Sequence, residues 1–207
     1  MTVTIAREGS IAVVTVDNPP VNALSQALRQ ALVDAVAEID ADAAVKAVVL
    51  ICAGRTFIAG ADVGEFGKPP QPPHLPDVVA HIEGAKKPWV AAIHGSALGG
   101  GLEVALGCAY RVAVASASLG LPEVRLGIIP GAGGTVRLPR LIGPAAAVDL
   151  VTGGSPVSAK KAEALASRLG EYGLRATHAA FFDTIRVVTP GPSRRVIERA
   201  RSKGYQL

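Results

Sequence analysis

The sequence predicts an α/β fold centred on one domain, and three observations support this prediction. Short runs rich in valine and isoleucine, typical of strands buried in a parallel sheet, recur along the chain. Segments with apolar residues at helical spacing lie between these runs. In addition, 49% of the 207 residues are hydrophobic and only 18% are charged, which is enough apolar material for a core. Strands and helices that alternate in this way indicate α/β architecture.

The N-terminal quarter is expected to form two strands around one helix. Residues 11–16 (IAVVTV) form a short β-branched strand, which the following Asn-Pro-Pro sequence ends. Ser25 is the expected N-cap of a helix that continues to about residue 40. The apolar residues of its buried face recur at helical spacing: Leu28, Leu32, Val36 and Ile39. Residues 46–52 (KAVVLIC) form the next strand, of the buried parallel type.

A proline-rich segment over residues 68–76 interrupts this pattern. It contains five prolines in nine residues, which excludes a helix or a central strand because proline lacks a backbone N–H and has a fixed φ. The alternation of elements resumes directly after it. We therefore interpret the segment as an excursion on the surface of the domain and not as a linker between domains.

The rest of the chain is expected to contain two more strands and then mainly helices. The strands are residues 89–93 (WVAAI) and 111–115 (RVAVA), both apolar and short. Helices are expected over residues 77–85, 102–108, 135–141, 145–151 and 158–169.

Charge and cysteine content exclude several classes of protein. Residues 171–207 hold seven of the 21 basic residues but three of the 17 acidic ones, so the body of the chain is neutral, which argues against a nucleic-acid-binding module. Cys52 and Cys108 have no second Cys or His at metal-ligand spacing, so we expect buried reduced thiols and no metal site. No secretory signal pattern and no membrane-length apolar run is present, so a cytoplasmic protein is expected.

Three consecutive glycines, Gly99, Gly100 and Gly101, stand between a predicted strand and a predicted helix. Glycine lets the backbone approach a ligand closely, and the first amides of a helix are unpaired at the positive end of its dipole. These amides could therefore bind a negative oxygen. The Gly-Lys-Ser/Thr of a phosphate loop and the Gly-x-Gly-x-x-Gly of dinucleotide-binding proteins are both missing. A purely structural role for the glycines is the alternative.

Two glutamates, Glu103 and Glu123, lie in otherwise apolar sequence, 20 residues apart. An apolar environment raises the pKa of a carboxyl group. Two such groups that face a common pocket could act as general acid and general base. Taken singly, either could be a surface glutamate, and the spacing alone does not establish that the two meet in space.

Three segments occur together in a specific order and spacing: residues 57–62 (FIAGAD), 94–103 (HGSALGGGLE) and 121–135 (LPEVRLGIIPGAGGT). They closely resemble the enoyl-CoA hydratase/isomerase (crotonase) family, and the resemblance extends from about residue 3 to residue 164. Residues 107–113 and 120–127 look most like the hydratase part of bifunctional fatty-acid oxidation enzymes. The resemblance implies a crotonase-like spiral of β-β-α turns, followed by a helical C-terminal region, in proteins that are often trimeric.

The resemblance also implies an active site. Ala59 and Gly100 stand where family members donate backbone N–H groups to the thioester oxygen, and both family glutamates are present as Glu103 and Glu123. Retention of both favours the hydration of 2-enoyl-CoA to 3-hydroxyacyl-CoA, with Glu103 activating water and Glu123 supplying the proton at C2. Further positions implied to bind substrate are Ala61, Asp62, Gly99 and Gly131. No metal and no cofactor is expected, because coenzyme A is part of the substrate.

The family pattern is lost near residue 165, where a different sequence replaces the Gly-Leu-Val expected there. We therefore expect a core domain over residues 1–165 and an atypical helical, basic tail over residues 166–207, so that the helical C-terminal region is reduced. The arginines of this tail could meet the phosphates of coenzyme A, nucleic acid or only water.

The expected partners are an acyl-CoA thioester and, by family analogy, further copies of the chain in a trimer or hexamer. Neither a nucleic acid nor a membrane is expected. Two alternatives stay open. A Δ3,Δ2-enoyl-CoA isomerase needs only one of the two glutamates, and a catalytically silent protein of the same fold would act by assembling with its relatives.

Overall fold

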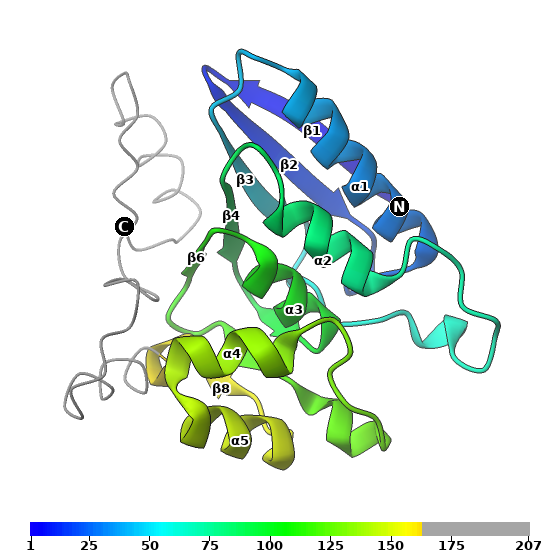
Figure 1. Ribbon diagram of the computed structural model, residues 1–207, viewed down its shortest axis with the longest axis vertical. Helices are drawn as coiled ribbons and strands as arrows, with labels where there is room; N and C mark the ends of the chain where they lie inside the picture. The colour runs from blue at the N-terminus through cyan, green and yellow to red at the C-terminus, as the bar shows by residue number, and fades with distance from the viewer. Residues whose placement is uncertain (163–207) are drawn as a thin grey trace.

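The structure, a computed structural model, describes residues 1–162. The tail predicted over residues 166–207, and the later part of the helix predicted over residues 158–169, lie outside the described residues. Most strands and helices follow one another as β-β-α units (Figure 1). In chain order these are β1-β2-α1, β3-α2, β4-β5-α3 and β6-β7-α4, followed by α5 and β8.

The larger sheet has the strand order β1-β2-β3-β4-β6. Its strands are β1 (Thr2–Glu8), β2 (Ile11–Asp17), β3 (Ala47–Cys52), β4 (Trp89–Ile93) and β6 (Tyr110–Ala113). The pairing of β1 with β2 is antiparallel, and every later pairing in this sheet is parallel. Helices α1, α2 and α3 form a layer beside it (Figure 1). Val14, Val48 and Leu50 are therefore fully buried.

The strands predicted over residues 11–16 and 89–93 are confirmed as β2 and β4. The strand predicted over residues 111–115 is shorter and begins one residue earlier, at Tyr110. Strand β1 was not predicted. It lies at the edge of the sheet and none of its residues is fully buried, so its sequence mixes polar and apolar residues without the apolar run that marked the other strands.

The helices lie close to their predicted positions. Their bounds are α1 (Gln26–Ala41), α2 (Leu75–Glu83), α3 (Gly100–Gly107), α4 (Gly134–Ile142) and α5 (Pro144–Gly153). Ser25 is confirmed as an N-cap, because its side chain accepts a hydrogen bond of 3.4 Å from Leu28 N. Helix α2 begins earlier than predicted, with Pro76 in its first turn, where no N–H is needed. None of the helices within residues 1–162 combines the length and hydrophobicity needed to span a bilayer.

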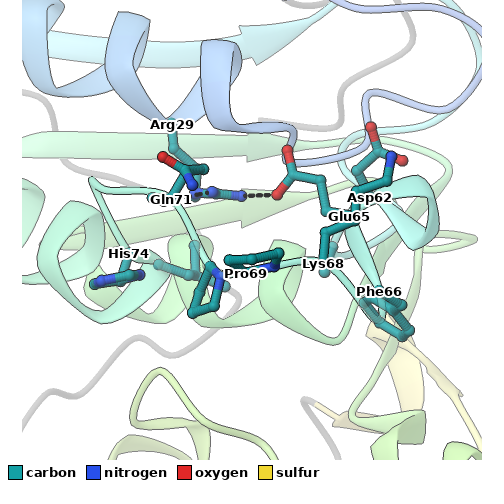
Figure 2. Close-up of a pocket in the computed structure, with 11 residues that line it drawn as sticks. Arg29, Asp62, Glu65, Phe66, Lys68, Pro69, Gln71 and His74 are labelled. Atoms are coloured by element: carbon teal, nitrogen blue, oxygen red, sulfur yellow. Dashed lines mark hydrogen bonds and ion pairs between the residues drawn. The ribbon is translucent and has the colours of Figure 1, made fainter.

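The proline-rich segment lies on the surface, and a buried arginine holds it there. Arg29 of α1 is only 8% exposed. Its Nε donates to Pro73 O at 2.7 Å and its Nη2 to Gln71 O at 3.0 Å. Its Nη1 donates to Leu24 O and to the Glu65 carboxylate, both at 2.8 Å (Figure 2). A buried charge needs such partners, so Arg29 fixes the course of this segment beside α1.

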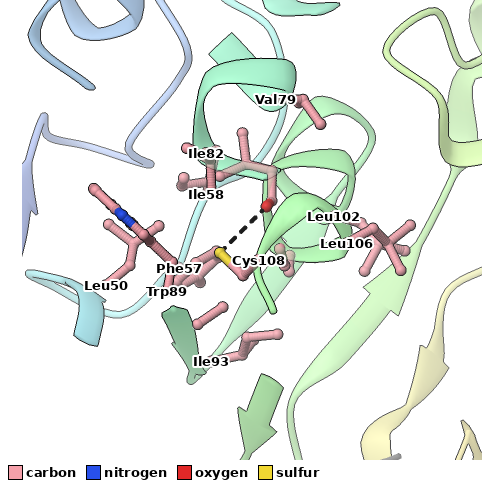
Figure 3. Packing of buried hydrophobic residues seen from close by; sticks show 14 of the residues in the cluster. Leu50, Phe57, Ile58, Val79, Ile82, Trp89, Ile93, Leu102, Leu106 and Cys108 are labelled. Carbon is pink, nitrogen blue, oxygen red and sulfur yellow. Dashed lines mark hydrogen bonds between the residues drawn. The ribbon is translucent and has the colours of Figure 1, made fainter. Parts of the chain in front are cut away.

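The hydrophobic core joins the larger sheet to α2 and α3 (Figure 3). Trp89 and Phe57 are its largest buried side chains, so aromatics contribute to the core although they make up only 4% of the sequence. Cys52 and Cys108 are free and buried, as predicted. Burial raises the pKa of the Cys108 thiol to about 12, so this thiol is unreactive at neutral pH.

The smaller sheet contains β5 (Ser96–Leu98), β7 (Ser118–Gly120) and β8 (Val157–Ser158) in that order. Strand β5 leads directly into α3, and β7 leads into the 3-10 helix η2 (Pro122–Leu126). Because β5 and β7 pair in parallel, with Leu98 opposite Gly120, both strands end at the same edge of the sheet. This pairing places the start of α3 beside η2, and these are the two segments that carry the predicted glutamates.

Candidate active site

Glu103 lies in the first turn of α3 and is 2% exposed. Its Oε1 accepts a hydrogen bond of 2.7 Å from Ala132 N and another of 2.9 Å from Gly134 N. Both donors belong to residues 131–134, which we call the 131–134 turn, directly before and at the start of α4. Two backbone donors on one oxygen fix the carboxylate in place and stabilise its ionised form.

Glu123 lies in η2 and is 8% exposed. Its Oε2 is buried and has no hydrogen-bond partner among the described residues. The carboxyl group packs against the start of α3, since a Cβ atom on Gly99 would lie 3.2 Å from Glu123 Oε1. Gly99 also has a φ of +52°, in the region that favours glycine. Gly99 therefore adjoins the candidate acid.

Both glutamates have raised pKa values, and burial is the main cause in each case. For Glu103, the hydrogen bonds from Gly134 N and Ala132 N and the charge of Arg137 oppose this rise in pKa. For Glu123, the negative charge of Glu103 raises the pKa further. The carboxyl groups are thus close enough for the charge of Glu103 to act on Glu123, and hydrogen-bond donors from another part of the chain oppose the rise in pKa only at Glu103.

The two amides predicted to bind the thioester oxygen have different surroundings. Gly100 is the first residue of α3, so its N–H has no partner within the helix. The N–H of Ala59, however, donates to Val21 O at 3.1 Å. The Ala59 N–H is therefore already engaged within the protein, which argues against the role predicted for it. Ala61 N lies 3.9 Å from the position of a Cβ atom on Gly100, so the backbone of Ala61 adjoins the start of α3.

The glycine run lets α3 begin in tight contact with other parts of the chain. A Cβ atom on Gly101 would lie 2.1 Å from Ile58 O, a backbone atom that has no freedom to move aside. A Cβ atom on Gly100 would lie 2.5 Å from Leu75 Cδ2. These glycines are thus required by close approach, which brings the helix N-terminus and the segment after β3 together.

A cavity of about 550 Å³ opens beside Ala61. Charged and apolar side chains surround it (Figure 2): Arg29, Asp62, Glu65, Phe66, Lys68, Pro69, Gln71 and His74. Leu75, which contacts the Gly100 position, also lines the cavity. The cavity therefore extends from Ala61, beside the start of α3, towards the proline-rich segment.

The remaining predicted residues have identifiable surroundings. Asp62 Oδ1 accepts a hydrogen bond of 2.9 Å from Gly64 N and caps the 3-10 helix η1 (Val63–Glu65). Gly131 is exposed, has open space around its Cβ position and does not line the cavity. Residues 1–162 contain no group of three or more His, Cys, Asp or Glu side chains placed to hold a metal ion.

Sequence reasoning missed Arg137. This residue stands three positions into α4 and donates through Nη1 to Ala132 O at 3.0 Å, so it contacts the turn that binds Glu103. Helix α4 contains two arginines, Arg137 and Arg140, and no sequence signal distinguishes the one that contacts the turn from the one that is exposed. Its contact depends on the path of the 131–134 turn.

Comparisons with known proteins agree on one family. Residues 6–166 match the family described as enoyl-CoA hydratase/isomerase. The peroxisomal bifunctional enzyme of Danio rerio is 52% identical over 153 residues, which are 74% of this chain and 21% of that protein. A probable enoyl-CoA hydratase of Bacillus subtilis (strain 168) is 44% identical over 167 residues, covering 77% of this chain and 65% of that protein. The chain thus spans less than two thirds of either relative.

Solved structures share the fold. The crystal structure of an enoyl-CoA hydratase from Bacillus anthracis superimposes with a TM-score of 0.78 at 32% identity, covering 98% of this chain and 76% of that chain. An enoyl-CoA hydratase structure from Geobacillus kaustophilus HTA426 gives a TM-score of 0.75 at 36% identity, covering 98% of this chain and 82% of that chain. The predicted spiral of β-β-α turns is confirmed by this agreement.

Proposed function

The chain belongs to the enoyl-CoA hydratase/isomerase family, and we propose that it adds water to a 2-enoyl-CoA thioester to give the 3-hydroxyacyl-CoA. One observation carries the proposal: two buried, interacting glutamates differ in their hydrogen bonding. Glu103 is held by two N–H donors, whereas Glu123 has an unpartnered oxygen. Hydration requires such a pair, because one group must accept a proton from water and another must deliver a proton to C2.

The proposed hydrogen-bond donors to the thioester oxygen are two backbone N–H groups, those of Gly100 and Ala61. When water attacks C3, the electron pair of the C2=C3 bond moves towards C1 and negative charge develops on the thioester oxygen. Donors aimed at this oxygen stabilise the enolate, and the loss of one such donor typically costs about 3–4 kcal/mol. The cavity beside Ala61 would hold one of the two substituents of the thioester group, the acyl chain or the coenzyme A moiety. Asp62 fixes the turn at the edge of this cavity.

Glu103 is the proposed general base. The N–H groups of Ala132 and Gly134 favour its ionised form, which can take the proton of the water whose oxygen bonds to C3. Glu123 is the proposed acid, because burial and the charge of Glu103 raise its pKa and so favour its protonated form. It gives its proton to C2 of the enolate. Exchange with solvent then returns the proton from Glu103 and reprotonates Glu123.

The test is turnover of crotonyl-CoA by the purified chain, followed by the loss of the enoyl-thioester absorbance. We expect hydration by the wild-type protein. Turnover of 3-hexenoyl-CoA to its 2-enoyl isomer without hydration of crotonyl-CoA would instead support the isomerase alternative. No turnover of either substrate by folded protein would support the silent assembly alternative.

The proposal also covers the cofactor, the association of the chain with itself and its location. The reaction needs no cofactor besides the coenzyme A carried by the substrate. The chain associates with copies of itself, which is supported by exposed apolar side chains in and after η2: Val124, Leu126, Ile128 and Ile129. It works in the cytoplasm, where a reducing environment suits its free cysteines. The mass in solution, measured by light scattering, tests the proposed self-association.

A further inference from the structure

Arg137 is held between the 131–134 turn and helix α2. Its Nη1 donates to Ala132 O at 3.0 Å. Its Nε and Nη2 donate to the two carboxylate oxygens of Glu83, at 3.1 Å and 2.6 Å. Glu83 is the last residue of α2. The guanidinium therefore connects the end of one helix to the turn that precedes another, with its planar fork used for a bidentate ion pair.

Residue 132 connects this arginine to the candidate base. The N–H of Ala132 donates to Glu103 Oε1 at 2.7 Å, while the C=O of the same residue accepts from Arg137. Displacing this carbonyl would reorient the turn that carries the amide. Glu103, Ala132, Arg137 and Glu83 thus form one hydrogen-bonded chain from the active site to the surface.

The guanidinium also packs against the turn itself. Gly133 has a φ of +93°, and a Cβ atom on it would lie 2.1 Å from Arg137 Nη1. The turn therefore depends on glycine both for its backbone conformation and for the space that Arg137 occupies.

We propose that Arg137, held by Glu83, is a positioning residue that keeps the 131–134 turn aimed at Glu103. The inference rests on the proposed role of Glu103 as general base. Arg137 touches no reacting atom in this scheme. It acts by orienting the two N–H donors and by placing a positive charge near the carboxylate.

The surrounding charges determine the sign of the expected pH effect. Arg137 lowers the pKa of Glu103 by its charge, and the neighbouring carboxyl group of Glu123 interacts with Glu103 from η2. Arg140, exposed on the same helix, acts on Glu83. Removal of Arg137 should therefore raise the pKa of Glu103, so that the base becomes ionised only at higher pH.

The ion pair is too exposed to be explained by stability alone. The Arg137 and Glu83 side chains are 19% and 55% exposed, and salt bridges with an exposed partner contribute little to folding. A role limited to stability therefore predicts a lowered Tm with unchanged chemistry in the remaining folded protein. A positioning role predicts a changed kcat and pH profile instead.

The experiment compares Arg137→Ala, Arg137→Lys and Glu83→Gln with Arg140→Ala as the matched control on the same helix. With crotonyl-CoA we expect kcat to fall about 10–100-fold in Arg137→Ala, with little change in KM, because a displaced catalytic group slows chemistry strongly. The acidic limb of its kcat profile should move to higher pH. Arg137→Lys keeps the charge but not the fork, so it should lose kcat while its acidic limb stays near the wild-type position. Glu83→Gln should show a smaller loss, and Arg140→Ala none.

A double-mutant cycle separates this inference from the proposed function. If Arg137 acts through Glu103, Arg137→Ala should cost little more when Glu103→Gln is already present. An equal loss in both backgrounds, or wild-type kcat and pH dependence in Arg137→Ala, would overturn the positioning role while leaving hydration intact. Failure of the wild-type protein to hydrate crotonyl-CoA would instead overturn the proposed function. If Arg137→Ala does not fold, Arg137→Lys and Glu83→Gln replace it in the same double-mutant cycle with Glu103→Gln.

Discussion

The segments that hold Glu103 and Glu123 give identical side chains opposite environments. The 131–134 turn offers two N–H donors to Glu103, whereas η2 leaves Glu123 Oε2 buried without a partner. Both carboxyl groups are buried, so desolvation raises both pKa values. The rise is opposed at Glu103 by two N–H donors from the 131–134 turn and by Arg137, and at Glu123 only by its own backbone N–H. Residue type and burial therefore do not distinguish the two carboxyl groups, and the proposed assignment of base and acid rests on the backbone around each of them.

The largest expected effects come from neutralising either glutamate. Glu103→Gln and Glu123→Gln should each lower kcat for crotonyl-CoA by roughly 10²–10⁴-fold, the usual contribution of a positioned acid or base. Their pH profiles should differ, because Glu103→Gln removes the acidic limb, which requires an ionised base, and Glu123→Gln removes the basic limb, which requires a protonated acid. Identical profiles, measured from pH-dependent initial rates, would show that the two environments do not separate the roles.

A smaller loss of kcat should follow from a side chain added beside the Glu103 carboxyl group. A Cβ atom on Gly134 would lie 3.1 Å from Glu103 Oε1 and 3.0 Å from Leu121 Cδ1, so Gly134→Ala must shift these neighbours. We expect kcat to fall about tenfold, because a small displacement of a catalytic group is costly. Gly153→Ala is the control, since its Cβ position in α5 is open. Unchanged initial rates in Gly134→Ala would mean that the hold on Glu103 is looser than proposed.

Thermal stability should reveal the unpaired carboxyl group directly. The pKa of folded Glu123 is raised, so the folded state binds this proton more tightly than the unfolded state does. Stability is therefore lost as the pH rises from the unfolded pKa of about 4.3 through the folded pKa. Glu123→Gln removes this loss and should raise Tm near pH 7 by a few degrees, since about 1 kcal/mol corresponds to roughly 2–4 °C in a domain of this size.

The gain in Tm should disappear below the unfolded pKa, where the carboxyl group is protonated in both states. Calorimetry at several pH values measures both parts of this expectation. A variant with a Tm below that of the wild type at neutral pH would indicate that the folded state stabilises the ionised form of Glu123, contrary to its raised pKa.

The smallest effect on activity is expected at Asp62, away from Glu103 and Glu123. Asp62→Ala removes the cap of η1 at the cavity edge and should cost about 0.5 kcal/mol, the lower end for a partly exposed cap. We expect a modest rise in KM for crotonyl-CoA with kcat and both pH limbs unchanged, because Asp62 contacts neither carboxyl group. A shifted pH limb in steady-state kinetics would show that Asp62 also affects the ionisation of Glu103 or Glu123.

Much of the fold and part of the site could be predicted from the local sequence. The strand at 89–93 and the Ser25 cap agree with the structure because apolar runs and capping residues act over a few neighbouring positions. Strand β1 could not be found this way, since an edge strand needs no continuous apolar sequence. The glycine run and the two glutamates stood out as unusual residues in apolar surroundings, although their meeting could not be derived.

The sequence by itself determined which chemical groups are present: a glycine-rich helix start, two glutamates in apolar segments and a neutral body. Only the tertiary structure decided how they are used. The parallel pairing of β5 with β7 brings Glu103 and Glu123 together, and the bond from Ala59 N to Val21 O engages that amide, whereas Ala61 N lies beside Gly100. Hydrogen bonding and desolvation depend on atoms distant in the chain, so neither the state of an amide nor the pKa of a buried carboxyl group follows from local sequence.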